Sequence, residues 1–216
     1  MLEEQRKRVL EACRQAEKFG LCGPGSGNFS EIDRSQGLVA ITPHNTDRSK
    51  MSWRDVLVMD LDGNVVDGSK DLKPTSETHF HIDIYKARKD ITAISHTHAP
   101  HCCVFAALGL EVKPIIFKAM NYKCKCPLAP FAEPNTVELG KTIIDTLGED
   151  GLACIMEKHG AITVSPESIE HAVRLSLYVE ETATCYYRAL QLIGLENKDK
   201  LAIDQDLLDE YMSRRK

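Results

Sequence analysis

The sequence lacks several features that would place it in a specialised class of protein. None of its hydrophobic runs approaches the roughly 18 residues that a membrane-spanning helix needs. Its start, MLEEQRKRVLEACRQ, carries charges where a signal peptide has an apolar core. We therefore expect a cytoplasmic protein without a membrane partner, in which the eight cysteines are reduced thiols.

Basic residues are also too few and too scattered for a nucleic-acid-binding surface. The 27 Lys and Arg residues are outnumbered by 32 Asp and Glu, which gives a net charge of -5. Only Arg214, Arg215 and Lys216 form a basic run. We therefore expect no nucleic-acid partner, although a local site can still bind a phosphate-bearing small molecule.

The glycine-rich segment GPGSGN, residues 23–28, does not match a nucleotide-binding motif. It follows an expected helix, lacks the G-x-G-x-x-G spacing, and has no GK[ST] after it. A dinucleotide-binding fold and a P-loop are therefore disfavoured. Two interpretations stay open: a plain flexible connection, or a loop in which Ser26 and Asn28 present donors to a phosphate.

Periodicity and turn residues predict one domain, residues 1–216, in which helices and strands are mixed. Without repeats or linkers, this pattern favours an α/β domain with a largely antiparallel sheet and helices on both sides. Helices are expected over 3–19, 77–90, 100–108, 135–147, 165–193 (capped by Ser165) and 201–216. Strands are expected over 38–42, 91–98, 112–117, 152–157 and 161–164, with a hairpin over 56–66.

The stretch ISHTHAPHCC, residues 94–103, is the strongest candidate for a metal site. His96 and His98 are two residues apart on an expected strand, so their side chains share a face. Two imidazoles on a rigid element make half of a zinc site, or alternatively one faces solvent and the other bonds a carbonyl. The remaining candidates for a third ligand are His44, His79, His81, His101, His159 and His171.

Two further residues have the right local context for such a site. His159 follows an expected strand and precedes Gly160, which lets the backbone turn and a ligand approach. Glu77 opens an expected helix, where a carboxylate stabilises the helix dipole. The same carboxylate beside histidine ligands would bind a metal at rest and act as a general base with substrate.

Five short motifs occur in order: GSGN (25–28), ITP (41–43), KPTSE (73–77), HTH (96–98) and HG (159–160). Together they resemble the class II aldolase/adducin family over most of the chain, and the HAPHC continuation looks most like its fuculose-phosphate branch. The resemblance implies a three-layer α/β/α domain with a mostly antiparallel sheet. It also implies a C4 homotetramer with active sites between subunits, where the C-terminal helix 201–216 would lie. One divalent ion per chain is implied, zinc first, with manganese or cobalt as alternatives.

The resemblance also implies roles for individual residues. His96, His98 and His159 would hold the metal, with Glu77 as a displaceable fourth ligand and the base. Epimerase members have Asp in place of Glu77, so aldolase chemistry is favoured. Tyr122, or Tyr211, would replace the family's proton-donating tyrosine, because Phe117 stands at its position. The substrate phosphate would bind Gly27, Asn28, His44, Asn45, Thr75 and Ser76, although His44-Asn45 replaces the small Ser/Thr-Gly pair common in the family.

The function implied is a zinc-dependent lyase that reversibly cleaves a ketose 1-phosphate, such as L-fuculose 1-phosphate. Its products would be dihydroxyacetone phosphate and a small aldehyde such as lactaldehyde. The same motifs would serve a 5-deoxyribulose-1-phosphate aldolase, a methylthioribulose-1-phosphate dehydratase, a ribulose-5-phosphate 4-epimerase or a decarboxylase. An adducin-like binding module is disfavoured, because it needs no metal set and all four positions are filled here. A zinc hydrolase is disfavoured by the absence of HExxH.

Overall fold

The fold is a single sheet between two layers of helices, and a computed structural model describes residues 1–214 of it. The strands are β1 (Asn28–Asp33), β2 (Leu38–Ile41), β3 (Leu57–Asp60), β4 (Val65–Asp67), β5 (Ala93–Thr97), β6 (Leu128–Ala129), β7 (Ala153–Met156) and β8 (Gly160–Ser165). They form one eight-stranded sheet in the order β4-β3-β2-β1-β5-β8-β7-β6. Every pair is antiparallel except β6 with β7, so the expected mostly antiparallel sheet is confirmed.

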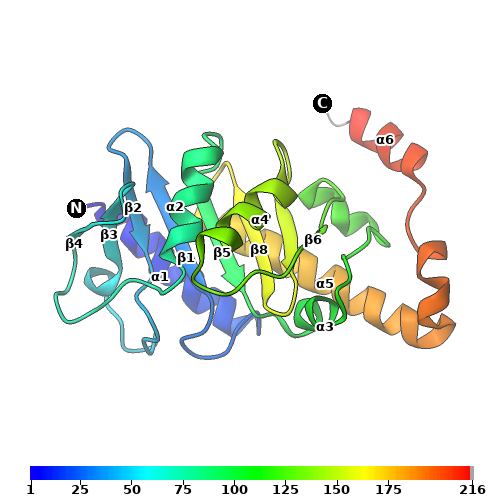
Figure 1. Ribbon diagram of the computed structural model, residues 1–216, viewed down its shortest axis with the longest axis horizontal. Helices are drawn as coiled ribbons and strands as arrows, with labels where there is room; N and C mark the ends of the chain where they lie inside the picture. Colours follow the sequence, from blue (N-terminus) through cyan, green and yellow to red (C-terminus); the bar gives the residue numbers. More distant parts are fainter. Residues whose placement is uncertain (215–216) are drawn as a thin grey trace.

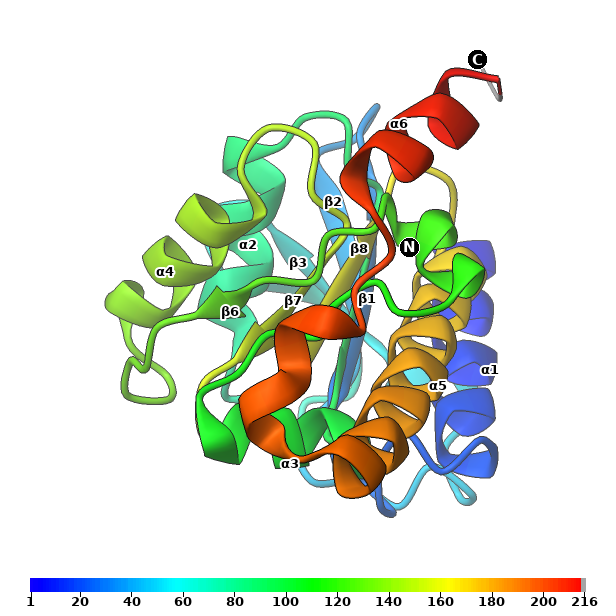
Figure 2. The ribbon, with the colours of Figure 1, turned by 90° about the vertical axis from the view of Figure 1, so that its right-hand side faces the viewer.

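Helices cover both faces of this sheet, as the three-layer prediction requires (Figure 2). The α-helices are α1 (Glu3–Lys18), α2 (Thr78–Ala87), α3 (Pro100–Leu108), α4 (Val137–Leu147), α5 (Ile169–Ile193) and α6 (Gln205–Ser213). Short 3-10 helices are η1 (Trp53–Asp55), η2 (Phe117–Tyr122) and η3 (Leu195–Lys200). Helices α2 and α4 pack together on one face, α1 and α5 on the other, while α6 projects from the body (Figures 1 and 2). Within residues 1–214, no helix is long and apolar enough to cross a membrane.

Three elements differ from the prediction. Residues 112–117 form no strand: Pro114 has no amide to donate to a ladder, and the chain turns there because Ile115 N donates to Lys113 O. Ser165 ends β8 instead of capping a helix; Ser168 caps α5, and its hydroxyl accepts from His171 N. The last helix begins at Gln205, and residues 215–216 of its expected span lie outside the described residues.

Strands β1 and β6 are the strands that the sequence pattern did not indicate, and β1 is the one that positions the site. It pairs with β2 on one side and with β5 on the other, so both of its edges are hydrogen-bonded. Because these neighbours run antiparallel to β1, its first residue, Asn28, lies opposite His96 near the end of β5. The start of β8 lies beside the same end, since Thr97 is opposite Ala161. One end of the sheet therefore collects polar residues from several chain segments.

Candidate metal centre

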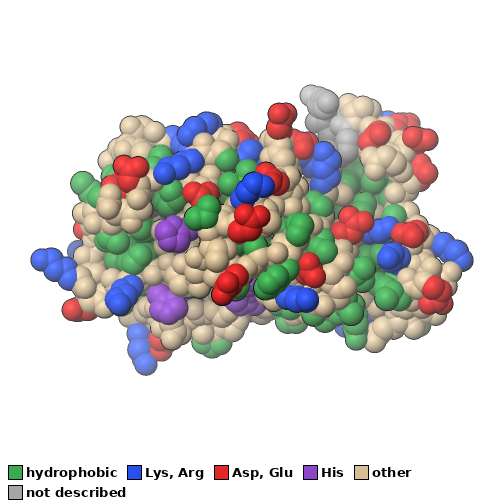
Figure 3. Space-filling view, in the orientation of Figure 1, with side chains coloured by type: hydrophobic (Ala, Val, Ile, Leu, Met, Phe, Trp, Pro, Cys, Tyr) green, Lys and Arg blue, Asp and Glu red, His purple; other side chains and the backbone are tan. Residues whose placement is uncertain are grey.

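The predicted metal ligands meet at this end of the sheet. His96 lies within β5, His98 directly follows that strand, and His159 lies in the turn between β7 and β8. The turn closes because His159 N donates to Met156 O, and Lys158 takes a left-handed conformation with φ of 57°. One ring nitrogen from each histidine lies within 4.8 Å of the other two. Histidine side chains are visible on this face of the molecule in the region of α2 and below β5 (Figure 3).

Hydrogen bonds at the outer ring nitrogens orient the two histidines of the HTH motif. His96 Nδ1 lies 3.0 Å from Ala161 O, and because a carbonyl only accepts, Nδ1 donates. His98 Nδ1 lies 2.7 Å from the Ser26 hydroxyl. The two Nε2 atoms are then directed inward and lie 3.0 Å apart. This is the usual arrangement of metal-binding histidines, whose second nitrogen bonds an outer partner.

Glu77 directs its carboxylate into the same cluster. It stands at the N-cap position of α2, yet its side chain makes no capping hydrogen bond. Its Oε2 lies 3.2 Å from His96 Nε2 and its Oε1 lies 3.1 Å from His159 Nε2. Only 8% of Glu77 is exposed. The alternative role, stabilising the helix dipole, therefore does not account for the direction of this side chain.

The charges in the cluster shift pKa values strongly. Burial raises the pKa of Glu77, but the closeness of His96 and His159 lowers it by more, and it ends well below its usual range. Burial, together with repulsion from His96 and His159, lowers the pKa of His98 to about 4. At neutral pH, Glu77 is consequently an anion and His98 a neutral imidazole with a free lone pair.

These groups fit a divalent cation. Tetrahedral zinc with bonds of about 2.0–2.1 Å to histidine separates its ligand atoms by about 3.3 Å. The separations between Nε2 and carboxylate atoms here, 3.0, 3.1 and 3.2 Å, are close to that value. Glu77 Oε1 is buried, and no donor among residues 1–214 forms a hydrogen bond with it. A cation between the three imidazoles and the carboxylate would satisfy this oxygen.

Two glycines allow the backbone to approach the cluster closely. A Cβ on Gly160 would lie 2.5 Å from Thr97 O and 2.8 Å from His98 Cδ2. A Cβ on Gly27 would lie 2.6 Å from His96 O, and its φ of 71° also disfavours other residues. Both positions therefore need glycine, because a larger residue would collide with β5 or with the histidine that follows it.

The residues predicted to bind phosphate lie near the same end of the sheet. Strand β2 ends beside the start of β1, so Thr42 N donates to Phe29 O. The segment after β2 then pairs with residues 73–75, because His44 N donates to Lys73 O and Thr75 N donates to Thr42 O. Asn28 and Thr75 are buried, Gly27 is half-buried, and His44, Asn45 and Ser76 are exposed.

Tyr122, the predicted proton donor, is not brought to this cluster within the chain. It lies in η2, fully buried, and its surroundings include Cys102, Cys126 and Thr182. Its hydroxyl has no hydrogen-bond partner among the described residues. A side chain enclosed in its own core is also badly placed to reach a neighbouring subunit.

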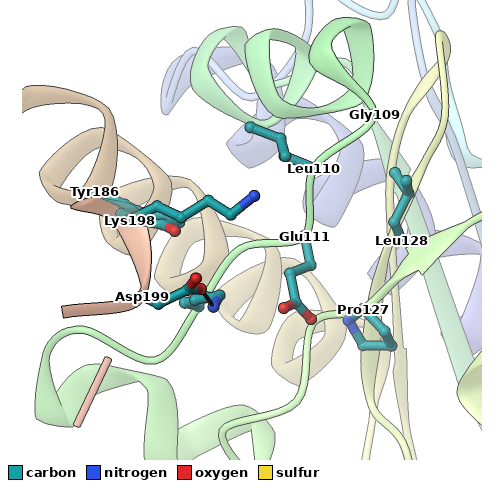
Figure 4. Close-up of a pocket in the computed structure, with 9 residues that line it drawn as sticks. Gly109, Leu110, Glu111, Pro127, Leu128, Tyr186, Lys198 and Asp199 are labelled. Atoms are coloured by element: carbon teal, nitrogen blue, oxygen red, sulfur yellow. Dashed lines mark hydrogen bonds and ion pairs between the residues drawn. The ribbon is translucent and has the colours of Figure 1, made fainter. Parts of the chain in front are cut away.

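A separate cavity of about 530 Å³ lies away from the histidines, between the segment after α3 and the end of α5 (Figure 4). Its polar groups include Glu111, Lys198, and the ion pair between Lys113 and Asp199. The cavity thus has two acidic and two basic side chains, whose charges cancel. None of the predicted site residues lines it. We therefore place the candidate active site at the histidines and not in this cavity.

Two residues support the centre from outside the ligand set: His81, named above among the candidate metal ligands, and Arg48, which the sequence did not indicate. Burial and repulsion from His96 lower the pKa of His81 to about 3, and its Nε2 lies 2.5 Å from Asn28 Oδ1. Arg48, also buried, donates to Gly27 O and forms an ion pair with Glu17. It therefore fixes the position of the glycine-rich segment 23–28, which we call the glycine loop. Neither has a local sequence signal, because each partner is distant along the chain.

Comparison with known proteins identifies the family. Residues 7–187 match the Class II Aldolase and Adducin N-terminal domain. A 5-deoxy-D-ribulose 1-phosphate aldolase of Bacillus thuringiensis is 31% identical over 192 residues, covering 87% of this chain and 86% of that protein. A 5-methylthioribulose-1-phosphate/5-deoxyribulose-1-phosphate aldolase of Rhodospirillum rubrum is 31% identical over 188 residues, covering 87% and 82%.

Solved structures agree with this likeness. An L-fuculose 1-phosphate aldolase superimposes with a TM-score of 0.88 at 25% identity, covering 98% of this chain and 95% of the other. The L-fuculose-1-phosphate aldolase of Thermus thermophilus has a TM-score of 0.75 at 22% identity, covering 88% and 97%, which speaks for the fold alone. The chain belongs to the class II aldolase and adducin family.

Proposed function

We propose that this protein is a divalent-metal-dependent lyase that cleaves 5-deoxyribulose 1-phosphate between C3 and C4. The two curated relatives that are 31% identical carry this substrate in their names. The observation that carries the proposal is the convergence of the Glu77 carboxylate on the Nε2 atoms of His96 and His159. An adducin-like binding module would not need these buried polar groups to face one another.

His96, His98 and His159 are the residues that would hold the cation, and Glu77 would release it when substrate arrives. A cation held by neutral imidazoles keeps its full charge and supplies Lewis-acid polarisation of the substrate's C2 carbonyl and C3 hydroxyl oxygens. We take zinc as the first candidate, with manganese or cobalt as alternatives. The donor set of three imidazoles and a carboxylate is typical of zinc.

Glu77 would move the proton at C3. In cleavage, the C4 hydroxyl loses its proton, the C3–C4 bond breaks, and C4 becomes the aldehyde carbon of acetaldehyde. The electron pair stays with C3, which takes a proton from Glu77 to give dihydroxyacetone phosphate. The Glu77 carboxylate first receives that proton from solvent, and the proton released at the C4 hydroxyl balances it. In synthesis, the Glu77 carboxylate removes that proton again. Because Glu77 is ionised in the resting site, it is ready to act in the synthetic direction.

The substrate phosphate would bind the exposed polar groups beside the glycine loop. His44, Asn45 and Ser76 offer side-chain donors there, with Gly27, Asn28 and Thr75 behind them. We propose His44 and Asn45 as phosphate ligands in place of a smaller pair. Loss of either donor should raise KM for the phosphorylated substrate and leave kcat nearly unchanged, because the donor binds the phosphate equally in the ground state and the transition state.

A second group must accept the proton of the C4 hydroxyl in cleavage and return it in synthesis. Tyr122 is buried away from the cluster, so we propose Tyr211 of a neighbouring subunit in a homotetramer. Tyr211 is 36% exposed on α6, which projects from the body (Figure 1). Replacing Tyr211 by Phe should lower cleavage but spare proton exchange at C3 of dihydroxyacetone phosphate, because that half-reaction needs no C4 group.

A cleavage panel tests the proposed function. The purified zinc-loaded protein is given 5-deoxyribulose, methylthioribulose, fuculose and rhamnulose 1-phosphates and ribulose 5-phosphate, and both products are measured. We expect dihydroxyacetone phosphate and acetaldehyde from 5-deoxyribulose 1-phosphate, with the rate lost in a chelator and restored by zinc. L-Fuculose 1-phosphate is the second candidate, because a fuculose aldolase shares the fold across nearly the whole chain. Cleavage of no ketose 1-phosphate would refute the proposal.

A further inference from the structure

A row of buried polar side chains runs from Glu77 away from the metal centre. Glu77 Oε2 lies 2.7 Å from Asn28 Nδ2, and Asn28 Oδ1 lies 2.5 Å from His81 Nε2. On the far side of the ring, His81 Nδ1 lies 2.7 Å from Ser30 Oγ, and Ser30 Oγ lies 2.8 Å from Tyr85 Oη. His81, Ser30 and Tyr85 are 0% exposed and Asn28 is 4% exposed. We call Asn28, Ser30, His81 and Tyr85 the buried relay.

The buried relay forms because polar residues on one face of strand β1 lie against polar residues on one face of helix α2. Asn28 and Ser30 are two residues apart on β1, so their side chains leave the same face of the strand. Glu77, His81 and Tyr85 are four residues apart along α2 and its N-cap, so they line one face of that helix. Side-chain hydrogen bonds join the β1 row to the α2 row. Polar residues at these positions can therefore satisfy one another without water.

The chemistry of each group fixes the direction of every hydrogen bond. A carboxylate only accepts, so Asn28 presents its NH2 group to Glu77 and its carbonyl oxygen to His81. That oxygen needs a donor, so the neutral His81 carries its proton on Nε2. Its Nδ1 then accepts from the Ser30 hydroxyl, whose oxygen accepts in turn from Tyr85. Every donor points toward Glu77, and reversing any link would set two acceptors or two donors against each other.

We infer that His81 is a positioning residue: with Ser30 and Tyr85 behind it, it fixes the Asn28 amide and, through that amide, the Glu77 carboxylate. Without a donor at His81 Nε2, the Asn28 amide is free to turn and direct its oxygen at the carboxylate, which repels it. The Glu77 carboxylate then loses its only side-chain donor outside the metal cluster among the described residues. The catalytic meaning of this inference rests on the proposed function, which makes Glu77 the base.

Four variants isolate the relay. His81→Leu removes both ring nitrogens. His81→Gln keeps a donor toward Asn28 and an acceptor toward Ser30, so it is the rescue variant. Ser30→Ala removes one hydroxyl with almost no change in shape. Ser176→Ala is the matched control, because Ser176 is also a buried serine, whose hydroxyl bonds Ser95 and Thr163 and lies outside the relay.

The first readout is exchange of the C3 proton of dihydroxyacetone phosphate with D2O, which reports Glu77 and needs no aldehyde. Residues that orient metal ligands typically contribute about 10–100-fold to activity or metal affinity. We expect kcat for exchange to fall by about this factor in His81→Leu and Ser30→Ala, with KM and zinc content unchanged. His81→Gln should recover most of the rate, and Ser176→Ala should match the wild type. Wild-type rates in Ser30→Ala, or no recovery in His81→Gln, would overturn the inference.

The second readout does not depend on catalysis. Nitrogen-15 NMR of the wild-type protein reports which ring nitrogen of His81 is protonated. We expect the proton on Nε2, whereas a proton on Nδ1 would reverse the relay and overturn the inference. If the wild type exchanges no proton from dihydroxyacetone phosphate, the proposed function fails, and this NMR result alone decides whether the relay stands. The two failures are thereby distinguishable.

Discussion

Replacing Gly160 by alanine would push a methyl group against two of the metal ligands. An added Cβ would lie 2.8 Å from His98 Cδ2, 3.4 Å from His96 Cε1 and 2.5 Å from Thr97 O. The last two atoms belong to a central strand that is hydrogen-bonded on both sides and has little room to move. The His98 ring, which follows the strand, is therefore the group that gives way.

The displacement has a definite size. Ordinary contact begins at 3.4 Å, so His98 Cδ2 must retreat by 0.6 Å (3.4 minus 2.8). Metal–ligand distances tolerate only about 0.2 Å. We therefore expect zinc affinity to fall by at least about tenfold, equivalent to about 1.4 kcal/mol. The contact with Thr97 O should also lower the free energy of unfolding of the metal-free protein by about 1–3 kcal/mol, as overpacking commonly does.

Competition with a chromophoric chelator measures the zinc dissociation constant, and urea unfolding measures stability. Gly148→Ala is the control, because Gly148 has a φ of 59° and nothing within 4 Å of an added Cβ. That variant should lose about 1 kcal/mol of stability through backbone strain and keep wild-type zinc affinity. If Gly160→Ala binds zinc as tightly as the wild type, the assignment of His96 and His98 as ligands held by this close contact is refuted.

Three further predictions concern Glu77, Tyr122 and the two buried histidines His81 and His98. Glu77→Gln should bind zinc and dihydroxyacetone phosphate but exchange the C3 proton about 10²–10⁴-fold more slowly; near-normal exchange would remove Glu77 as the base. Tyr122→Phe should keep wild-type cleavage kinetics and not lose stability, because it removes a buried hydroxyl without a partner among residues 1–214; a large fall in kcat would restore Tyr122 as proton donor. The folded pKa values of His81 and His98, about 3 and about 4, lie below the ordinary 6.5. The metal-free protein should therefore be fully stabilised above about pH 6.5 and lose stability as the pH falls toward 4, with His81→Gln lowering that slope by up to about 1.4 kcal/mol per pH unit; an unchanged slope would show that His81 is not held neutral.

The elements that sequence predicted well are those with a strong local signal. Pro100 at the first position gives α3 its start, and Gly109 in a left-handed conformation ends it. The hairpin was indicated by Asp62-Gly63, and the structure has a turn there between β3 and β4. In both cases the decisive interactions lie within a few residues of one another, so a local pattern is sufficient.

Strand β1 was not predicted because several of its buried side chains are polar. Asn28, Ser30 and Glu31 are all buried, although their side chains suggest a loop or a solvent-facing strand. Their hydrogen bonds go to Glu77, His81 and Arg8, which come from two different helices or their caps. Such partners are invisible to a local pattern.

The segment 112–117 was misjudged for the opposite reason. Its apolar, β-branched residues favour a strand, but Pro114 removes a donor and the chain turns into η2 instead.

The metal ligands were nominated by residue type and spacing, but only the fold explains their convergence. His96 and His98 share a strand, which the sequence could indicate, whereas His159 meets them only because β8 pairs with β5. His81 was one of several helical histidines without a distinguishing local feature. Its role depends on a contact with Asn28, 53 positions away in the chain. Long-range pairing of this kind decides which histidine binds a ligand and which one supports the site.

The most direct test of the central claim is an anomalous-scattering measurement at the zinc edge on crystals of the zinc-loaded protein. We predict one strong peak per chain within about 2.0–2.2 Å of the Nε2 atoms of His96, His98 and His159, and none there in a His96→Ala variant. A peak elsewhere, or a wild-type crystal without a peak at these three atoms, would contradict the account.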